Sequence, residues 1–158
     1  MTSDQFAGEA VHEAGHAVMA RLLGLGLKRV HINLAEASGR TCVVWPGAHQ
    51  DPRKNLRILA AARACMRAFD KDTFHEEGGI GDEGAIRTIL DEICEDDEAV
   101  RINCINTIDA ELSTIFGRAD VRAAALALAE ILTETGELDG SRAEAIIDHH
   151  LSHSVGAS

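Results

Sequence analysis

The sequence lacks the features by which several classes of protein are recognised. No apolar run approaches the roughly 18–20 residues that a membrane-spanning helix needs, and the first residues show neither the basic patch nor the apolar stretch of a signal peptide. Lysine and arginine number 15 against 26 aspartates and glutamates, which gives a formal net charge of −11. A surface that binds nucleic acid or an anionic membrane needs a cluster of lysine and arginine side chains. We therefore expect a cytoplasmic protein that binds neither nucleic acid nor membrane.

Cysteine pairs at metal-binding or redox spacing are also missing. The four cysteines are widely spaced and form no Cys-x-x-Cys pair, namely Cys42, Cys65, Cys94 and Cys104. Because their neighbours are apolar, we expect reduced, buried thiols. Hydrophobic residues make up 46% of the 158 residues and charged residues 26%, which is ordinary for a globular protein. This length suits one domain with its own core, which we place over residues 1–158.

Near its N-terminus the sequence contains His12-Glu13-Ala14-Gly15-His16. Residues i and i+4 of a helix lie on one face, so His12 and His16 could hold a single zinc ion. Glu13 follows the first histidine, and its carboxylate could act as general base towards a zinc-bound water. The alternative is a polar stripe on a surface helix. The tyrosine with which some zinc peptidases stabilise the oxyanion is excluded, because the chain has no tyrosine.

The apolar periodicity predicts a mainly α-helical (α+β) domain with a small antiparallel hairpin or sheet beside the motif helix. The first helix, capped at residue 3 or 4, is expected to end near Leu23, and Gly15 within it indicates the close approach of another backbone. The alternating patterns of residues 28–34 and 40–45 predict the hairpin. From Glu98 to the end we expect only helices, with ends at Gly117 and Gly136 and an apolar stripe from Val121 marking the second of them. The expected helix starts after the hairpin are Asp51, Glu83, Glu98 and Ser141, the last helix being short.

A catalytic zinc usually has three protein ligands and a water, so the motif needs a third residue from elsewhere. Asp82 lies between glycines that let the backbone bend, at the head of a predicted helix that would hold its carboxylate rigidly. Aspartate is also a favoured N-cap residue, so Asp82 could simply cap that helix. Spacing alone favours neither the zinc ligand nor the helix cap. The rival ligands are His75, Glu76, Glu77 and Glu83.

The order of these segments resembles the protease domain of the FtsH family of ATP-dependent zinc metalloproteases. In that family a His-Glu-Ala-Gly-His-Ala helix opens the domain, and residues 12–17 match it. A hairpin, an alanine-rich helix and a Gly-rich segment follow, and Asp82 stands where that segment ends in the family's third zinc ligand. Leu138-Asp139-Gly140 resembles the turn before the family's closing helix. The resemblance implies His12, His16 and Asp82 as zinc ligands and Glu13 as catalytic base.

The sequence departs from the family in three places. It has no counterpart of the ATPase module or the membrane anchors, so we expect a free-standing domain. Gly81 replaces the usual asparagine before Asp82, and residues 63–67 read Arg-Ala-Cys-Met-Arg where the family tends to have Ala-Glu-Glu. The lost acids would support ligands or subunit contacts rather than bind zinc themselves. No role is assigned to His31, His49, His149, His150 or His153, the last three of which fit an exposed chain end.

The expected function is that of a zinc-dependent metalloendopeptidase that hydrolyses peptide bonds in unfolded polypeptides or peptides. Zinc would activate a water and polarise the scissile carbonyl, and Glu13 would carry the proton to the leaving amine. A substrate strand could pair with the exposed edge of residues 40–45. The alternative is a non-catalytic interaction or regulatory module with a structural or vestigial zinc site. Assembly as a homo-oligomer and an ATPase partner in trans stay open.

Overall fold

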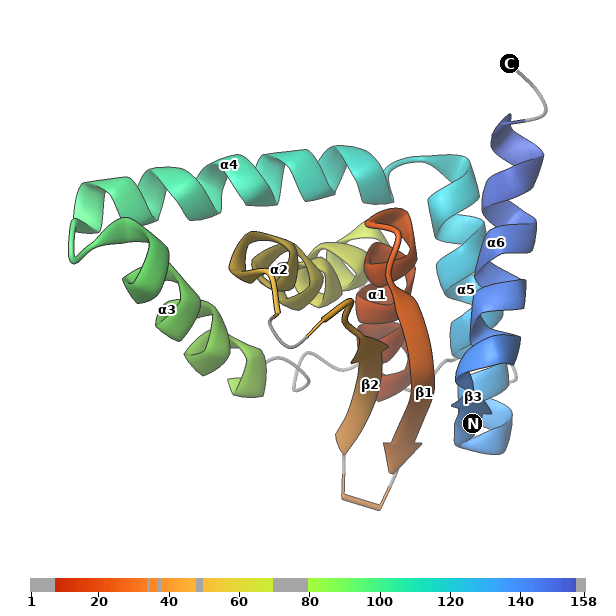
Figure 1. Cartoon of the computed structure of the whole chain (residues 1–158). Helices are drawn as coiled ribbons and strands as arrows, with labels where there is room; N and C mark the ends of the chain where they lie inside the picture. The colour runs from red at the N-terminus through yellow and green to blue at the C-terminus, as the bar shows by residue number, and fades with distance from the viewer. Residues whose placement is uncertain (1–7, 34, 37, 48–49, 70–79, 156–158) are drawn as a thin grey trace.

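The computed structural model describes residues 8–33, 35–36, 38–47, 50–69 and 80–155. Along these residues the elements are α1 (Gly8–Leu22), β1 (Gly26–Asn33), β2 (Ser38–Val44), α2 (Pro52–Ala68), α3 (Ile80–Cys94), α4 (Glu98–Phe116), α5 (Ala119–Thr135), β3 (Glu137–Asp139) and α6 (Gly140–Val155). The predicted mainly helical α+β fold is confirmed. In Figure 1, α1 and α2 occupy the centre, α4 runs across the top, and α5 and α6 stand side by side. None of the described helices is long and apolar enough to cross a membrane.

The helix that carries the motif, α1, is the central element of the fold. It packs against α2, α5, β1 and β2, and every residue from Glu13 to Ala20 is buried. Its apolar periodicity predicts one buried face, but alanine and glycine at the other positions let neighbouring elements cover those faces too. Two polar side chains are thereby shielded as well, with Glu13 at 4% and His16 at 6% exposure. Burial of two such groups favours a polar site over a surface stripe.

Gly15 lies where α2 packs directly onto α1. A Cβ placed on Gly15 would lie 2.8 Å from the Cβ of Cys65 and 2.9 Å from the Cα of Ala62. Distances below 3.0 Å are not tolerated by real Cβ atoms, so the two helices could not approach in this way with a side chain at Gly15. The predicted close approach of another backbone is confirmed, and the alanine-rich α2 provides it.

Substituting Gly15 by alanine is therefore expected to destabilise the protein, although alanine is the better helix former. Two of the three nearest atoms belong to the backbone of α2, so the clash should cost an amount towards the upper end of about 1–3 kcal/mol, more than the roughly 1 kcal/mol gained in helix propensity. Gly84 offers a matched control, since it lies within α3 and no atom comes within 4 Å of its added Cβ. Gly84→Ala should leave the free energy of unfolding unchanged or raise it by up to about 1 kcal/mol. Urea unfolding measures both, and equal effects would contradict this packing.

The sheet has three antiparallel strands in the order β2-β1-β3. The β1–β2 hairpin is the predicted one, with Val30 opposite Thr41. The prediction that only helices follow Glu98 is wrong at β3, which pairs with Arg29, Val30 and His31 of β1. Gly136, with a φ of 78°, ends α5 in the left-handed conformation and lets the chain turn back along β1. Among the described residues, β2 is left as an edge strand beside α1.

Two helix starts differ from those predicted. α3 begins at Ile80, so Gly81 and Gly84 are helical and Asp82 lies inside the first turn instead of capping it. α6 begins at Gly140 and is 16 residues long, whereas a short helix from Ser141 was expected. The backbone N–H of Arg142 donates to Asp139 Oδ1 at 2.9 Å, so Asp139 caps this helix. The predicted cap of the first helix at residue 3 or 4 lies outside the described residues.

Candidate metal centre

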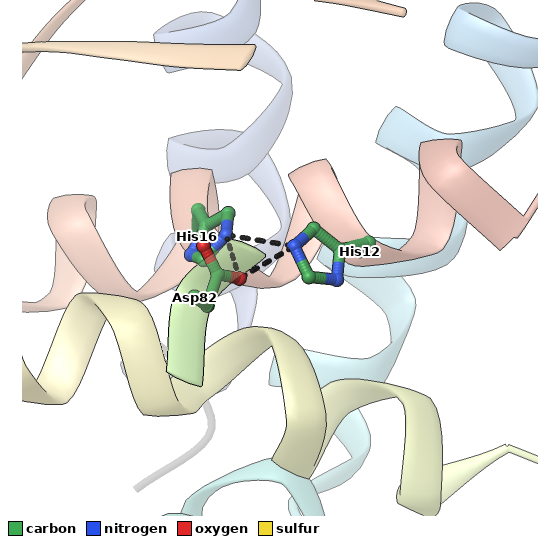
Figure 2. Close-up of side chains that lie close together, drawn as sticks. All are labelled: His12, His16 and Asp82. Atoms are coloured by element: carbon green, nitrogen blue, oxygen red, sulfur yellow. Dashed lines mark hydrogen bonds and ion pairs between the residues drawn. The ribbon is translucent and has the colours of Figure 1, made fainter. Parts of the chain in front are cut away.

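Three side chains from two helices converge on one point, as Figure 2 shows. His12 and His16 lie one turn apart on α1, with their Nε2 atoms 3.1 Å from each other. Oδ2 of Asp82, from the first turn of α3, lies 2.6 Å from His12 Nε2 and 3.1 Å from His16 Nε2. Within the described part of the chain, this is the one group of histidine, cysteine and carboxylate side chains that could hold a metal ion.

The ring of His16 presents a lone pair to this group. Its Nδ1 lies 2.7 Å from the backbone carbonyl oxygen of Ile58 in α2. A carbonyl oxygen can only accept, so Nδ1 carries a proton and the neutral ring keeps its lone pair on Nε2. Metal-binding histidines are commonly oriented by such a second hydrogen bond. Two acceptor atoms 3.1 Å apart, His16 Nε2 and Asp82 Oδ2, then require a proton or a metal cation between them.

The segment that departs from the FtsH pattern does not reach the metal-binding group with a charged side chain. Arg63 faces α4 instead, where its Nη2 donates to Oδ1 of Asp109 at 3.0 Å. Cys65 packs against Gly15, and burial raises the pKa of its thiol, which keeps it a neutral neighbour. α2 therefore supports the group through the carbonyl of Ile58 rather than through an acidic side chain. No described residue hydrogen-bonds the buried Nδ1 of His12.

In the absence of metal, protons hold the group together. Burial lowers the pKa of His16, but the hydrogen bond to Asp82 and the charges of Glu13 and Asp82 outweigh it and leave that pKa above 6.5. Burial likewise raises the pKa of Asp82, but hydrogen bonds and charges from both histidines outweigh it and hold that pKa well below its usual range. The Asp82 contribution to stability is present above about pH 4 and lost as the pH falls further. The His16 contribution is present below about pH 6.5 and lost as the pH rises through the raised pKa.

This proton must leave before a metal can bind, so metal affinity is expected to depend on pH. Below the raised pKa of His16 the apparent affinity for zinc should rise about tenfold per pH unit, and above that pKa it should level off. Competition with a chromophoric chelator between about pH 5.5 and 8.5 measures this dependence. An affinity that does not change with pH would contradict the placement of a shared proton between His16 and Asp82.

Glu13 borders a groove beside the metal-binding group. The groove has a volume of about 380 Å³ and runs between β2, which contributes residues 39–43, and α2. His16 and Asp82 also line it, so it leads to the candidate metal position. The Oγ1 of Thr41 lies 2.8 Å from Oε1 of Glu13, and this contact has no sequence signal. The groove, the buried carboxylate and the three converging side chains form one continuous site.

Among the residues that the structure describes, Glu83 and three of the unassigned histidines lie outside this group. Glu83 is exposed and lies next to Asp82 in α3 without joining it. His31 lies on β1, and the rings of His149 and His150 on α6 contact each other at 5.4 Å between centroids. The side chains outside the described part of the structure are those of His49, His75, Glu76, Glu77 and His153.

The fold and the site together define a mainly helical domain with a candidate metal centre of two histidines and one aspartate. No protein-family model matches the chain, and no curated protein matches its sequence. The resemblance to the FtsH protease domain therefore stays a prediction from the motifs.

Proposed function

We propose that this chain is a zinc-dependent peptidase of the FtsH-protease type that cleaves unfolded polypeptides or peptides. The observation that carries the proposal is the position of Glu13. Its buried carboxylate borders the same groove as His16 and Asp82, next to the group that could hold a metal ion. A base beside a Lewis acid, both reached from one groove, is the arrangement that hydrolysis requires.

The choice of zinc and of hydrolysis depends on more than the ligand set. Two histidines and one carboxylate also bind Fe(II) in oxygenases. In a tetrahedral zinc site with bonds of about 2.0–2.1 Å, ligand atoms lie about 3.3 Å apart. The three atoms here are 2.6–3.1 Å apart, so they would move apart by about 0.2–0.7 Å to hold the ion. Hydrolysis is favoured because Glu13 supplies a base that oxygen activation does not need. His12, His16 and Asp82 would hold the zinc.

Zinc in this position would supply a Lewis acid for the scissile carbonyl and for the attacking water. The protein's own side chains would then transfer the proton and hold the metal-binding atoms in position. Glu13 takes a proton from the attacking water and passes it to the nitrogen of the leaving amine. His16, fixed by the carbonyl of Ile58, and Asp82, fixed in the first turn of α3, keep the ligand atoms in place beside Glu13.

The groove also favours an extended substrate. β2 is an edge strand in the described sheet, and five consecutive β2 residues, 39–43, line the groove. A peptide can add to such an edge through main-chain hydrogen bonds, which discriminate little between side chains. Since only an extended chain can pair in this way, unfolded proteins, short peptides and flexible tails are the proposed substrates.

Cleavage of casein by protein purified without added metal tests this proposal. We expect about one zinc ion per chain, loss of cleavage after treatment with 1,10-phenanthroline, and recovery when zinc is restored. Treatment with the non-chelating 1,7-phenanthroline is the control. Cleavage that survives complete removal of metal would contradict the proposal, and so would a zinc-loaded protein that cleaves neither casein nor short peptides.

A further inference from the structure

β2 contacts the carboxylate of Glu13 as well as lining the groove. The hydroxyl of Thr41 lies 2.8 Å from Oε1 of Glu13 and 3.1 Å from the backbone oxygen of the same residue. A hydroxyl has one proton to donate, so it serves one of these acceptors at a time, and the carboxylate oxygen is the nearer and the more strongly charged. The Thr41 hydroxyl is thus placed to hold Oε1.

Gly39 allows the strand to lie this close. A Cβ on Gly39 would stand 2.8 Å from Cγ of Glu13 and 3.2 Å from its Cδ. The absence of a side chain therefore brings the backbone of β2 into contact with the Glu13 side chain. Glu13 is held between its own helix and β2, with 4% of its surface exposed. Little solvent reaches Oε1, so Thr41 is its principal donor among the described residues.

We propose that Thr41 is a positioning residue for the proton transfer by Glu13, an inference that rests on the proposed peptidase function. The hydroxyl holds Oε1 and leaves Oε2 to accept the proton of the attacking water. The water's O–H bond breaks, its proton goes to Oε2, and its oxygen bonds to the scissile carbon while the carbonyl π bond opens onto the carbonyl oxygen. As that π bond re-forms, the C–N bond breaks and Oε2 returns the proton to the amine nitrogen, so Glu13 ends as a carboxylate and Thr41 keeps its own proton.

The Thr41 hydroxyl should affect the rate of proton transfer rather than substrate or metal binding. Its loss leaves a buried carboxylate oxygen without a donor, and the carboxylate then rotates away from its working orientation. The main chain of β2, which would pair with the substrate, is unchanged. The three atoms that could hold the metal are also unchanged, since Thr41 contacts none of them in the described structure.

Kinetics of Thr41→Val and Thr41→Ser on a quenched fluorescent peptide test this inference. We expect T41V to lower kcat about 10- to 100-fold with KM and zinc content within about twofold of wild type, and T41S to stay within about threefold in kcat. Thr107→Val is the matched control, because the Thr107 hydroxyl donates to a helix carbonyl, that of Asn103, far along the chain on α4. T107V should not change kcat.

Three results would overturn the inference: wild-type kcat in T41V, an equal fall in T41S and T41V, or a fall explained by lost zinc. If T41V does not fold, Thr41→Ala and T41S differ by one oxygen and make the same comparison.

A wild-type protein without any turnover would contradict the proposed peptidase function, but it would not test the role of Thr41 in holding Glu13. The hydroxyl is then judged by binding of a dipeptide hydroxamate to zinc-loaded protein, because a hydroxamate, unlike a substrate, would give its proton to Glu13 as it binds. Trp45, the single tryptophan, lines the groove and monitors this binding. About tenfold weaker binding to T41V than to T41S supports the inference, and equal binding overturns it.

Discussion

Glu13→Gln is expected to abolish peptide cleavage while leaving the metal content unchanged. Glutamine has the shape of glutamate, and its amide oxygen can still accept the hydrogen bond that Thr41 donates to Oε1. It cannot take a proton from water, so we expect kcat to fall about a thousandfold or more. Glu13 is not one of the three converging side chains, so the zinc stoichiometry should stay that of wild type. Peptide turnover and elemental analysis measure the two properties on the same sample.

Glu9→Gln makes the same chemical change one turn earlier on α1. Glu9 is not among the described residues that line the groove, so this variant should cleave like wild type. A Glu13→Gln protein that still degrades casein would rule out Glu13 as the base. A variant that loses both zinc and activity would instead make Glu13 part of the metal-binding group.

Asp82→Ala is expected to remove the metal from the protein. Its Oδ2 is the carboxylate oxygen of the group, and without it two imidazoles are left to hold the ion. We expect elemental analysis to find about one zinc ion per wild-type chain and almost none per variant chain. Cleavage should be lost together with the metal. His12→Ala should have the same effect, because it removes a second of the three atoms.

Glu83→Ala is the matched control for this substitution. Glu83 follows Asp82 in the same helix, but it is exposed and lies outside the group. The variant should keep zinc and activity. If Glu83→Ala lost the metal and Asp82→Ala retained it, the third ligand would be Glu83 and not Asp82. Full zinc content in Asp82→Ala alone would show that another residue completes the site.

The parts of the fold that sequence could predict are those with strong local signals. Regular apolar spacing predicts α4 and α5, and the aspartate–proline pair at 51–52 predicts the start of α2, where Asp51 indeed caps the helix. β3 was missed because three residues are too short to show a period. Its extended state comes from pairing with β1, more than a hundred residues away in the chain. The early start of α3 was missed because Gly81 and Gly84 indicate a bend when only local preference is considered.

In the candidate site, too, the features with a local sequence signal could be predicted, and those that depend on long-range packing could not. The spacing of His12 and His16 follows from helix geometry alone, so sequence was sufficient to place both on one face. Asp82 is 66 residues from His16, so spacing alone does not favour a ligand over a helix cap, and it is the resemblance to the FtsH protease domain that implies a ligand. The carbonyl of Ile58 and the hydroxyl of Thr41 could not be predicted. Their positions depend on how α2 and β2 pack onto α1, which no local pattern encodes.

A crystal structure with an anomalous difference map at the zinc absorption edge tests the central claim most directly. We expect one peak within bonding distance of His12 Nε2, His16 Nε2 and the Asp82 carboxylate, with a water in the remaining position facing the groove. A zinc ion elsewhere, or no zinc at all, would contradict the account. A fourth protein ligand in place of the water would also contradict it, because a closed site is structural and would favour a non-catalytic interaction module.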